Sequence, residues 1–70
     1  MTFELEQVLA KLSETKTSAK MLTLTKWNGN PAKLDIRLWR TDIDPIQPCK
    51  GMTLTNSEAE ALADALNNYL

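Results

Sequence analysis

KLDIRLWR, residues 33–40, alternates apolar and polar side chains along its whole length. Successive side chains of a strand point to opposite faces, so one face receives three aliphatic residues: Leu34, Ile36 and Leu38. The other face receives Lys33, Asp35, Arg37 and Trp39. The first set is typical of a core face, whereas the second places an indole among charged groups. We therefore expect a half-buried strand whose tryptophan lies outside the core.

The preceding stretch predicts a second strand that pairs with the first. MLTLTKW, residues 21–27, also alternates, with Leu22 and Leu24 directed inward. Its outward side chains are those of Thr23, Thr25 and Trp27. NGNP, residues 28–31, follows, and Asn-Gly is a strong signal for a hairpin turn. Residues 21–39 are therefore predicted to form a hairpin with both tryptophans on the face opposite to the leucines.

The chain after Arg40 predicts a loop, a short strand and a helix. Two prolines, Pro45 and Pro48, argue against regular pairing in TDIDPIQPC, whereas KGMTL at residues 50–54 is typical of a fourth strand. Thr55 and Glu58 have the spacing of a capping box, which predicts a helix from about Asn56 to Tyr69. Its apolar stripe, which can cover the leucine face of the sheet, consists of Ala59, Leu62, Ala63, Leu66 and Tyr69.

The first segment gives a conflicting signal. In FELEQVLAKLSE, residues 3–14, the apolar side chains of Leu5, Val8, Leu9 and Leu12 recur at helical spacing. Its Glu, Gln, Leu, Ala and Lys residues are also good helix formers. The residues alone therefore predict a helix here.

Length and composition indicate a single folded domain, residues 1–70, with a small core. A chain this short hides only about 60% of the surface that its unfolded form exposes, so association with a second copy would help. Hydrophobic residues make up 43% and charged residues 24%, as in folded proteins. The sequence contains neither an apolar run long enough to span a bilayer nor the pattern of a signal peptide, so we expect a cytoplasmic protein without a membrane partner.

The residue types argue against an enzyme. The chain has no histidine, and its only cysteine, Cys49, has neither an imidazole to activate it nor a second cysteine with which to hold zinc. Asp42 and Asp44 precede a proline and are typical of a solvated turn. Two glycines in the whole chain cannot form a glycine-rich phosphate loop. We therefore expect no catalytic residues, no metal, no cofactor and no small-molecule substrate.

Charge is distributed unevenly although the net charge is only -1. Residues 16–50 carry seven lysines and arginines against three aspartates, whereas the flanking segments are acidic. A local positive field attracts polyanions, which the average over the chain conceals. The plainer interpretation is that these lysines keep exposed strands soluble.

Several of these stretches together resemble a known family. The run Trp27-Asn28, then Lys33, Asp35-Ile36-Arg37 and Trp39, then Lys50-Gly51-Met52-Thr53-Leu54, is similar to the single-stranded DNA-binding domain of the transcriptional coactivator positive cofactor 4. It is more similar still to the bacterial YdbC-type relatives of that domain. The likeness covers nearly the whole chain. Those relatives carry a glycine and an aromatic residue where this chain has Thr17, Ser18 and Ala19, and their loop corresponding to Arg40–Cys49 is shorter.

The resemblance implies an α+β fold in which a four-stranded antiparallel β-sheet is followed by one C-terminal α-helix. It implies a strand at residues 3–12 and a homodimer joined through helix and sheet. It also implies a basic, aromatic-lined surface for a single strand, with Trp27 and Trp39 stacking on bases and Asp35 orienting Arg37 or a neighbouring cation. The proposed nucleic-acid-binding residues are Lys20, Lys26, Trp27, Lys33, Arg37, Trp39, Arg40 and Lys50. The alternative for either indole is burial at the dimer interface.

Two functions follow from these expectations. The first is the binding of single-stranded DNA, or of RNA, with little sequence preference, in transcription regulation or DNA maintenance. The alternative is a small dimeric protein-interaction module that uses the same surface, because Trp and Arg are favoured at binding hot spots.

Overall fold

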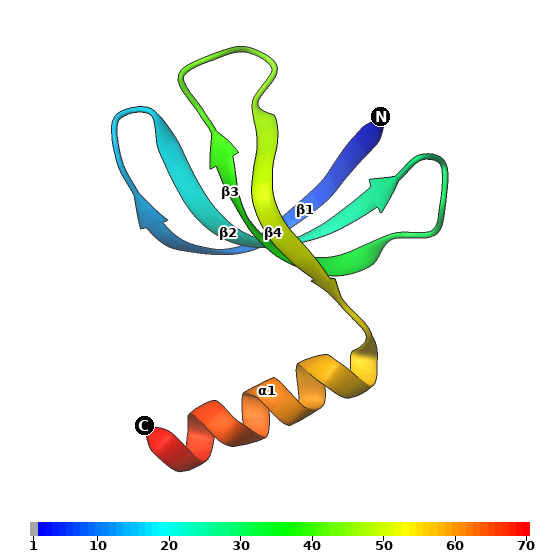
Figure 1. Ribbon diagram of the computed structural model, residues 1–70, viewed down its shortest axis with the longest axis vertical. Coiled ribbons are helices and arrows are strands. Elements are labelled where there is room, and N and C mark those ends of the chain that lie inside the picture. Colours follow the sequence, from blue (N-terminus) through cyan, green and yellow to red (C-terminus); the bar gives the residue numbers. More distant parts are fainter. Residues whose placement is uncertain (1) are drawn as a thin grey trace.

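The structure, a computed structural model, describes residues 2–70 as four antiparallel strands followed by one helix (Figure 1). The elements are β1 (Phe3–Glu14), β2 (Ser18–Trp27), β3 (Lys33–Arg40), β4 (Gln47–Leu54) and α1 (Asn56–Tyr69). Neighbours in the chain are neighbours in the sheet, whose order is β1-β2-β3-β4. The α+β fold expected from the sequence is therefore confirmed. No helix in residues 2–70 has the length and apolar character needed to cross a membrane.

The first segment is a strand, so the helix predicted from its residues alone is wrong. β1 pairs with β2, but the register shifts three times, between Leu5 and Gln7, Val8 and Ala10, and Lys11 and Ser13. At each shift β1 contains one residue more than β2, so a given face recurs every three residues instead of every two. This spacing explains why the apolar residues imitate a helix. The strand implied by the family resemblance is correct, and it continues beyond residue 12 to Glu14.

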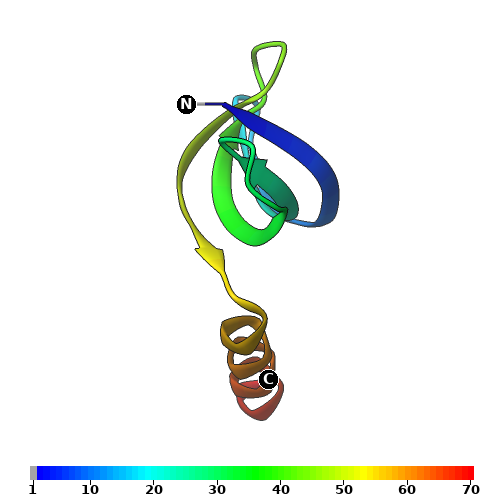
Figure 2. The ribbon, with the colours of Figure 1, turned by 90° about the vertical axis from the view of Figure 1, so that its right-hand side faces the viewer.

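The extra residues of β1 also account for the shape of the sheet. A β-bulge bends its strand and increases the local twist, and β1 contains three such irregularities in succession. Figure 2 shows the result: the strands curl around a common interior, and α1 lies beneath them. The β1–β2 and β3–β4 loops lie together at one end of the sheet, and the β2–β3 turn lies at the other end, where β4 ends and α1 begins.

The predicted β2–β3 hairpin is present. Asn28 and Gly29 both have positive φ angles, 52° and 78°, and the Asn30 amide donates to the Trp27 carbonyl at 2.9 Å. This is the backbone of a turn of type I′, which matches the twist of paired strands. The turn is also joined to the start of β1, because the Asn28 amide donates to the Thr2 carbonyl and the Thr2 amide donates to Asn28 Oδ1. The hairpin end of the sheet is thus closed by residues 2 and 28–30.

The fourth strand is longer than predicted. It begins at Gln47, and Pro48 pairs with Trp39 in the β3–β4 register. The prediction that the prolines exclude residues 47–49 from the sheet is therefore wrong. β4 is an edge strand, where a proline can be accommodated because its missing N–H need not serve a neighbour.

Alternation correctly predicts which side chains of β2 and β3 share a face, but the buried face is the opposite of the one expected. The most buried apolar residues are Ala19, Met21 and Trp39, and the buried polar residues are Thr23, Thr25 and Asp35. The half-buried Phe3, Leu5, Trp27 and Ile46 pack against this core. In contrast, Leu22, Leu24, Leu34 and Ile36 are only half-buried. The curled sheet encloses the tryptophan face and leaves the leucine face open.

The helix faces the leucine side of the sheet across an apolar cleft of about 250 Å³. The cleft is lined by Leu12, Leu22, Leu34, Ile36 and Leu54 from the sheet and by Ala59, Leu62, Ala63 and Leu66 from α1. The predicted capping box is present: Thr55 Oγ1 accepts from the Glu58 amide at 3.1 Å, and Glu58 Oε1 accepts from the Thr55 amide at 2.8 Å. No residue of α1 is buried.

Candidate nucleic-acid interface

Trp39 lies at the centre of the core, with 0% of the residue exposed. Its ring packs edge-on against Phe3, with centroids 5.5 Å apart, and stacks with Trp27 at 6.3 Å. The expectation that this indole lies outside the core is wrong, and so is its alternative, burial at a dimer interface, because the ring is covered within one chain. The physical reason is the curl of the sheet, which brings β1 over the tryptophan face. Trp39 therefore offers no free ring face to a base.

Trp27 is half-buried at the edge of the same core. The guanidinium carbon of Arg37 lies 4.4 Å from the centroid of its ring, which is within the range of a cation–π contact. The indole also contacts Phe3, at a centroid distance of 6.1 Å. The guanidinium of Arg37 therefore covers part of the Trp27 ring, which is not a bare indole.

Arg37 is held in place by a buried carboxylate. Its Nε and Nη2 donate to Asp35 Oδ1 and Oδ2 at 2.6 and 2.8 Å, and its Nη1 donates to the Cys49 carbonyl at 3.1 Å. The Asp35 side chain is fully buried and that of Arg37 is 14% exposed. A bidentate pair of this kind satisfies a carboxylate that could not otherwise be buried. The prediction that Asp35 orients Arg37 is confirmed.

Gly51 allows β4 to approach this pair. A Cβ atom at residue 51 would lie 2.5 Å from both the Arg37 Cα and the Ile36 carbonyl oxygen, and closer still to the Arg37 Cβ. Any other side chain would therefore push β4 away from Arg37. This contact gives a structural reason for the glycine in KGMTL.

Lys26 already has acidic partners on β1. Its ammonium lies 3.1 Å from a carboxylate oxygen of Glu6 and 4.0 Å from one of Glu4. The hydrogen bond to Glu6 and the two nearby negative charges raise the pKa of Lys26. Its positive charge is thus largely balanced inside the molecule.

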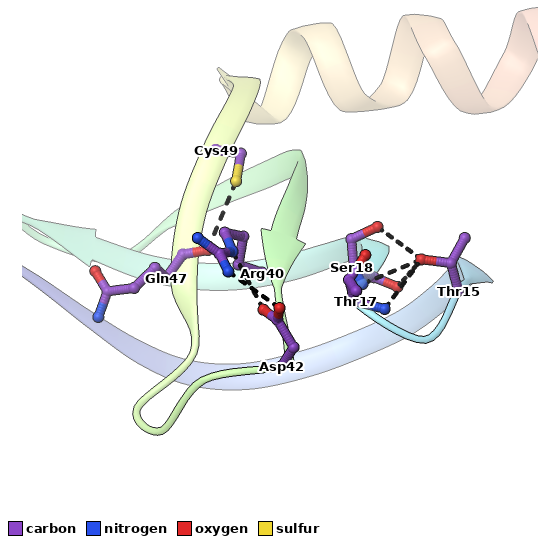
Figure 3. A network of polar contacts seen from close by, with 7 residues as sticks. All are labelled: Thr15, Thr17, Ser18, Arg40, Asp42, Gln47 and Cys49. Atoms are coloured by element: carbon purple, nitrogen blue, oxygen red, sulfur yellow. Dashed lines mark hydrogen bonds and ion pairs between the residues drawn. The ribbon is translucent and has the colours of Figure 1, made fainter.

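Arg40 is paired in the same way. Its Nε and Nη2 donate to Asp42 Oδ1 and Oδ2 at 3.1 and 3.0 Å (Figure 3). The hydrogen bonds to Arg40 lower the pKa of Asp42 below its usual value, and they raise that of Arg40. Asp42 lies in the solvated loop that the sequence predicts, but its pairing with Arg40 is not part of that prediction.

Three of the predicted cations, Lys20, Lys33 and Lys50, are exposed and form no salt bridge within residues 2–70. They do not share one face. In the β2–β3 register Lys33 pairs with Thr25, on the tryptophan side, whereas Lys20 pairs with Leu38, on the leucine side. Lys50 falls at the register shift of β4 opposite Leu38. The predicted residues therefore divide between two faces of a curved sheet.

The turn from β1 to β2 adds polar groups that sequence reasoning did not include in the site. Thr15 Oγ1 accepts from the amides of Thr17 and Ser18, and the Thr41 amide donates to the Thr17 carbonyl at 3.0 Å. Figure 3 shows these hydroxyl groups and the Arg40–Asp42 pair at the same end of the sheet. Lys16, part of the basic middle of the sequence, belongs to this turn.

Comparison with known proteins leaves the family of the chain open. No family model matches it. An uncharacterized protein of Treponema pallidum (strain Nichols) is 50% identical over 42 residues, which cover 60% of this chain and 47% of that protein. The chain thus spans about half the length of this relative, whose description assigns no activity.

Proposed function

We propose that this chain binds single-stranded nucleic acid with little sequence preference, as a member of the family of positive cofactor 4 and the YdbC-type proteins. The observation that carries the proposal is an imbalance of charge on the sheet. Each carboxylate on the strands, those of Glu4, Glu6, Glu14 and Asp35, is paired with a cation. Lys20, Lys33 and Lys50 remain without an acidic partner within residues 2–70. Lysines of this kind are suited to phosphate groups.

The shape of the sheet supports a preference for a flexible strand over a duplex. The longest dimension of the molecule is 38 Å, whereas duplex DNA stays nearly straight over its persistence length of ~50 nm. A duplex would touch a curled sheet of this size at one place only. A single strand can bend with the surface and reach lysines on both sides of it.

Because Trp39 is buried, it cannot contribute base stacking to the proposed interaction. Stacking on exposed aromatic rings gives many single-strand binders much of their affinity. Here the Arg37 guanidinium, which is fixed by Asp35 and lies over Trp27, is itself mostly buried, and it covers part of the remaining indole. We therefore expect phosphate contacts to contribute more than base stacking, and the affinity to depend strongly on salt.

A homodimer is the second part of the proposal. α1 is amphipathic, yet none of its residues is buried, and its Leu62 and Leu66 border the apolar cleft. The leucine face on the other side of the cleft is also incompletely covered. A second copy that packs its own helix and sheet against these surfaces would bury both, which a small domain needs for stability.

A titration with labelled oligonucleotides tests the function directly. We expect a single strand to bind more tightly than a duplex of the same sequence, and single strands of unrelated sequence to bind about equally. Equal binding of duplex and single strand would contradict the single-strand preference. If no oligonucleotide binds, the result favours the alternative, a protein-interaction module.

A further inference from the structure

One end of the leucine face collects positive side chains from three strands. In the sheet register Arg40 pairs with Ser18 of β2 and with Gln47 of β4, and Lys20 pairs with Leu38. The alternation of strands places Ser18, Lys20, Leu38 and Arg40 on one face. Lys50 lies opposite Leu38 at the register shift of β4. We call Lys20, Arg40 and Lys50 the basic end of the sheet.

Within the basic end, the two lysines and the arginine differ in one respect. Lys20 and Lys50 have no acidic partner within residues 2–70, whereas both oxygens of the Asp42 carboxylate occupy the guanidinium of Arg40. The Arg40 side chain is nevertheless 54% exposed. The fork that Asp42 fills is the same group that binds a phosphate bidentately. A phosphate and Asp42 would therefore compete for the same donors.

We propose that the basic end is where phosphate groups of the nucleic acid bind, and that Asp42 is an internal competitor which a phosphate displaces from Arg40. This inference rests on the function proposed above and adds a means of regulating it. An exposed ion pair of this type is weak enough to be exchanged. The loop that carries Asp42 thus limits the affinity of the sheet for polyanions.

The displacement of Asp42 by a phosphate affects how strongly the affinity depends on salt concentration. When a free lysine neutralises a phosphate, a counterion is released from the strand, and the logarithm of affinity falls by roughly 0.7 per phosphate for each unit of log salt. When Arg40 exchanges Asp42 for a phosphate, the freed carboxylate attracts a cation in turn. The net release at Arg40 is therefore smaller than at Lys20 or Lys50.

The test compares Asp42→Asn with Asp44→Asn. Both changes remove one negative charge from the same loop, but Asp44 forms no salt bridge within residues 2–70. We expect Asp42→Asn to tighten binding of a single-stranded oligonucleotide by about two- to fivefold, the range that corresponds to one exposed ion pair, and Asp44→Asn to have a smaller effect. The salt slope of Asp42→Asn should be steeper by up to roughly 0.7.

The Arg40→Gln background completes the experiment. Without Arg40 the chain should bind more weakly. Adding Asp42→Asn should then give no gain in affinity, because Asp42 no longer has a guanidinium with which to pair. Equal gains from Asp42→Asn and Asp44→Asn, or a gain that persists with Arg40→Gln, would overturn the inference while leaving the proposed function in place. If the unaltered chain binds no oligonucleotide, the proposed function itself fails.

Discussion

Trp39 is buried in the structure, whereas its sequence context predicts an indole outside the core. Because its ring is fully buried against Phe3 and Trp27, its removal should affect folding more than binding. We expect Trp39→Ala to lower the free energy of unfolding by about 3–5 kcal/mol, as other large aromatic truncations in cores do, and Trp39→Phe to cost less because a ring remains. Denaturant unfolding and oligonucleotide affinity should be measured on the same samples.

Ile43 is a control for this experiment, since it is a large hydrophobic residue that is 38% exposed, in the loop between β3 and β4 and outside the apolar stripe of α1. Ile43→Ala should leave stability nearly unchanged. If Trp39→Phe instead kept full stability and lost affinity, Trp39 would have to contact the nucleic acid, and the burial seen in the structure would not describe the bound state.

Trp39 also shows where sequence reasoning about residues succeeds and where it stops. The two-residue period correctly places Trp39, Arg37 and Asp35 on one face, and the Asp35–Arg37 pair follows from that proximity. Which face is enclosed does not follow, because it depends on the curvature of the whole sheet. The ion pairs of Lys26 and Arg40 were missed for a related reason: their partners lie on β1 and in the loop after β3, outside the pattern of the strand itself.

Among the elements, β1 is the one whose sequence misleads. Its apolar residues follow a period near three because each of the three register shifts adds one residue to β1. A period near three is indistinguishable from that of an amphipathic helix in a segment of 12 residues. The hairpin and α1, in contrast, are fixed by local signals, namely Asn28-Gly29 and the Thr55–Glu58 capping box, and both were predicted correctly.

The exposed apolar stripe of α1 gives a prediction about assembly. Leu66 borders the cleft and is 47% exposed in the single chain, so a dimer contact at this stripe would be broken by Leu66→Glu. We expect sedimentation to show a dimer for the unaltered chain and a lower mass for Leu66→Glu. Asn67→Glu, the same charge one residue further along α1, should remain dimeric. A monomer mass for the unaltered chain at micromolar concentrations would contradict the homodimer.

The molecule as a whole combines a core enclosed by a curled sheet with a surplus of lysines on that sheet. The surplus is not visible in the net charge of -1, because the acidic residues Glu58, Glu60 and Asp64 of α1 offset these lysines in the total. The fold that the family resemblance implies, a four-stranded antiparallel sheet followed by one helix, is the fold of the structure. The resemblance did not predict which of the proposed binding residues are accessible, since their accessibility depends on the curl of β1 and on internal ion pairs.

The most direct test is a salt series of single-strand affinity for the unaltered chain and for a variant with Lys20, Lys33 and Lys50 all changed to alanine. The account predicts a slope of log affinity against log salt of about -2 to -3 for the unaltered chain, from roughly -0.7 per phosphate, and a slope shallower by about 2 for the variant. Lys11→Ala, which removes a lysine already paired with Glu14, should change the slope little. A slope near zero for the unaltered chain, or an unchanged slope in the triple variant, would contradict the claim that these lysines bind a nucleic-acid backbone.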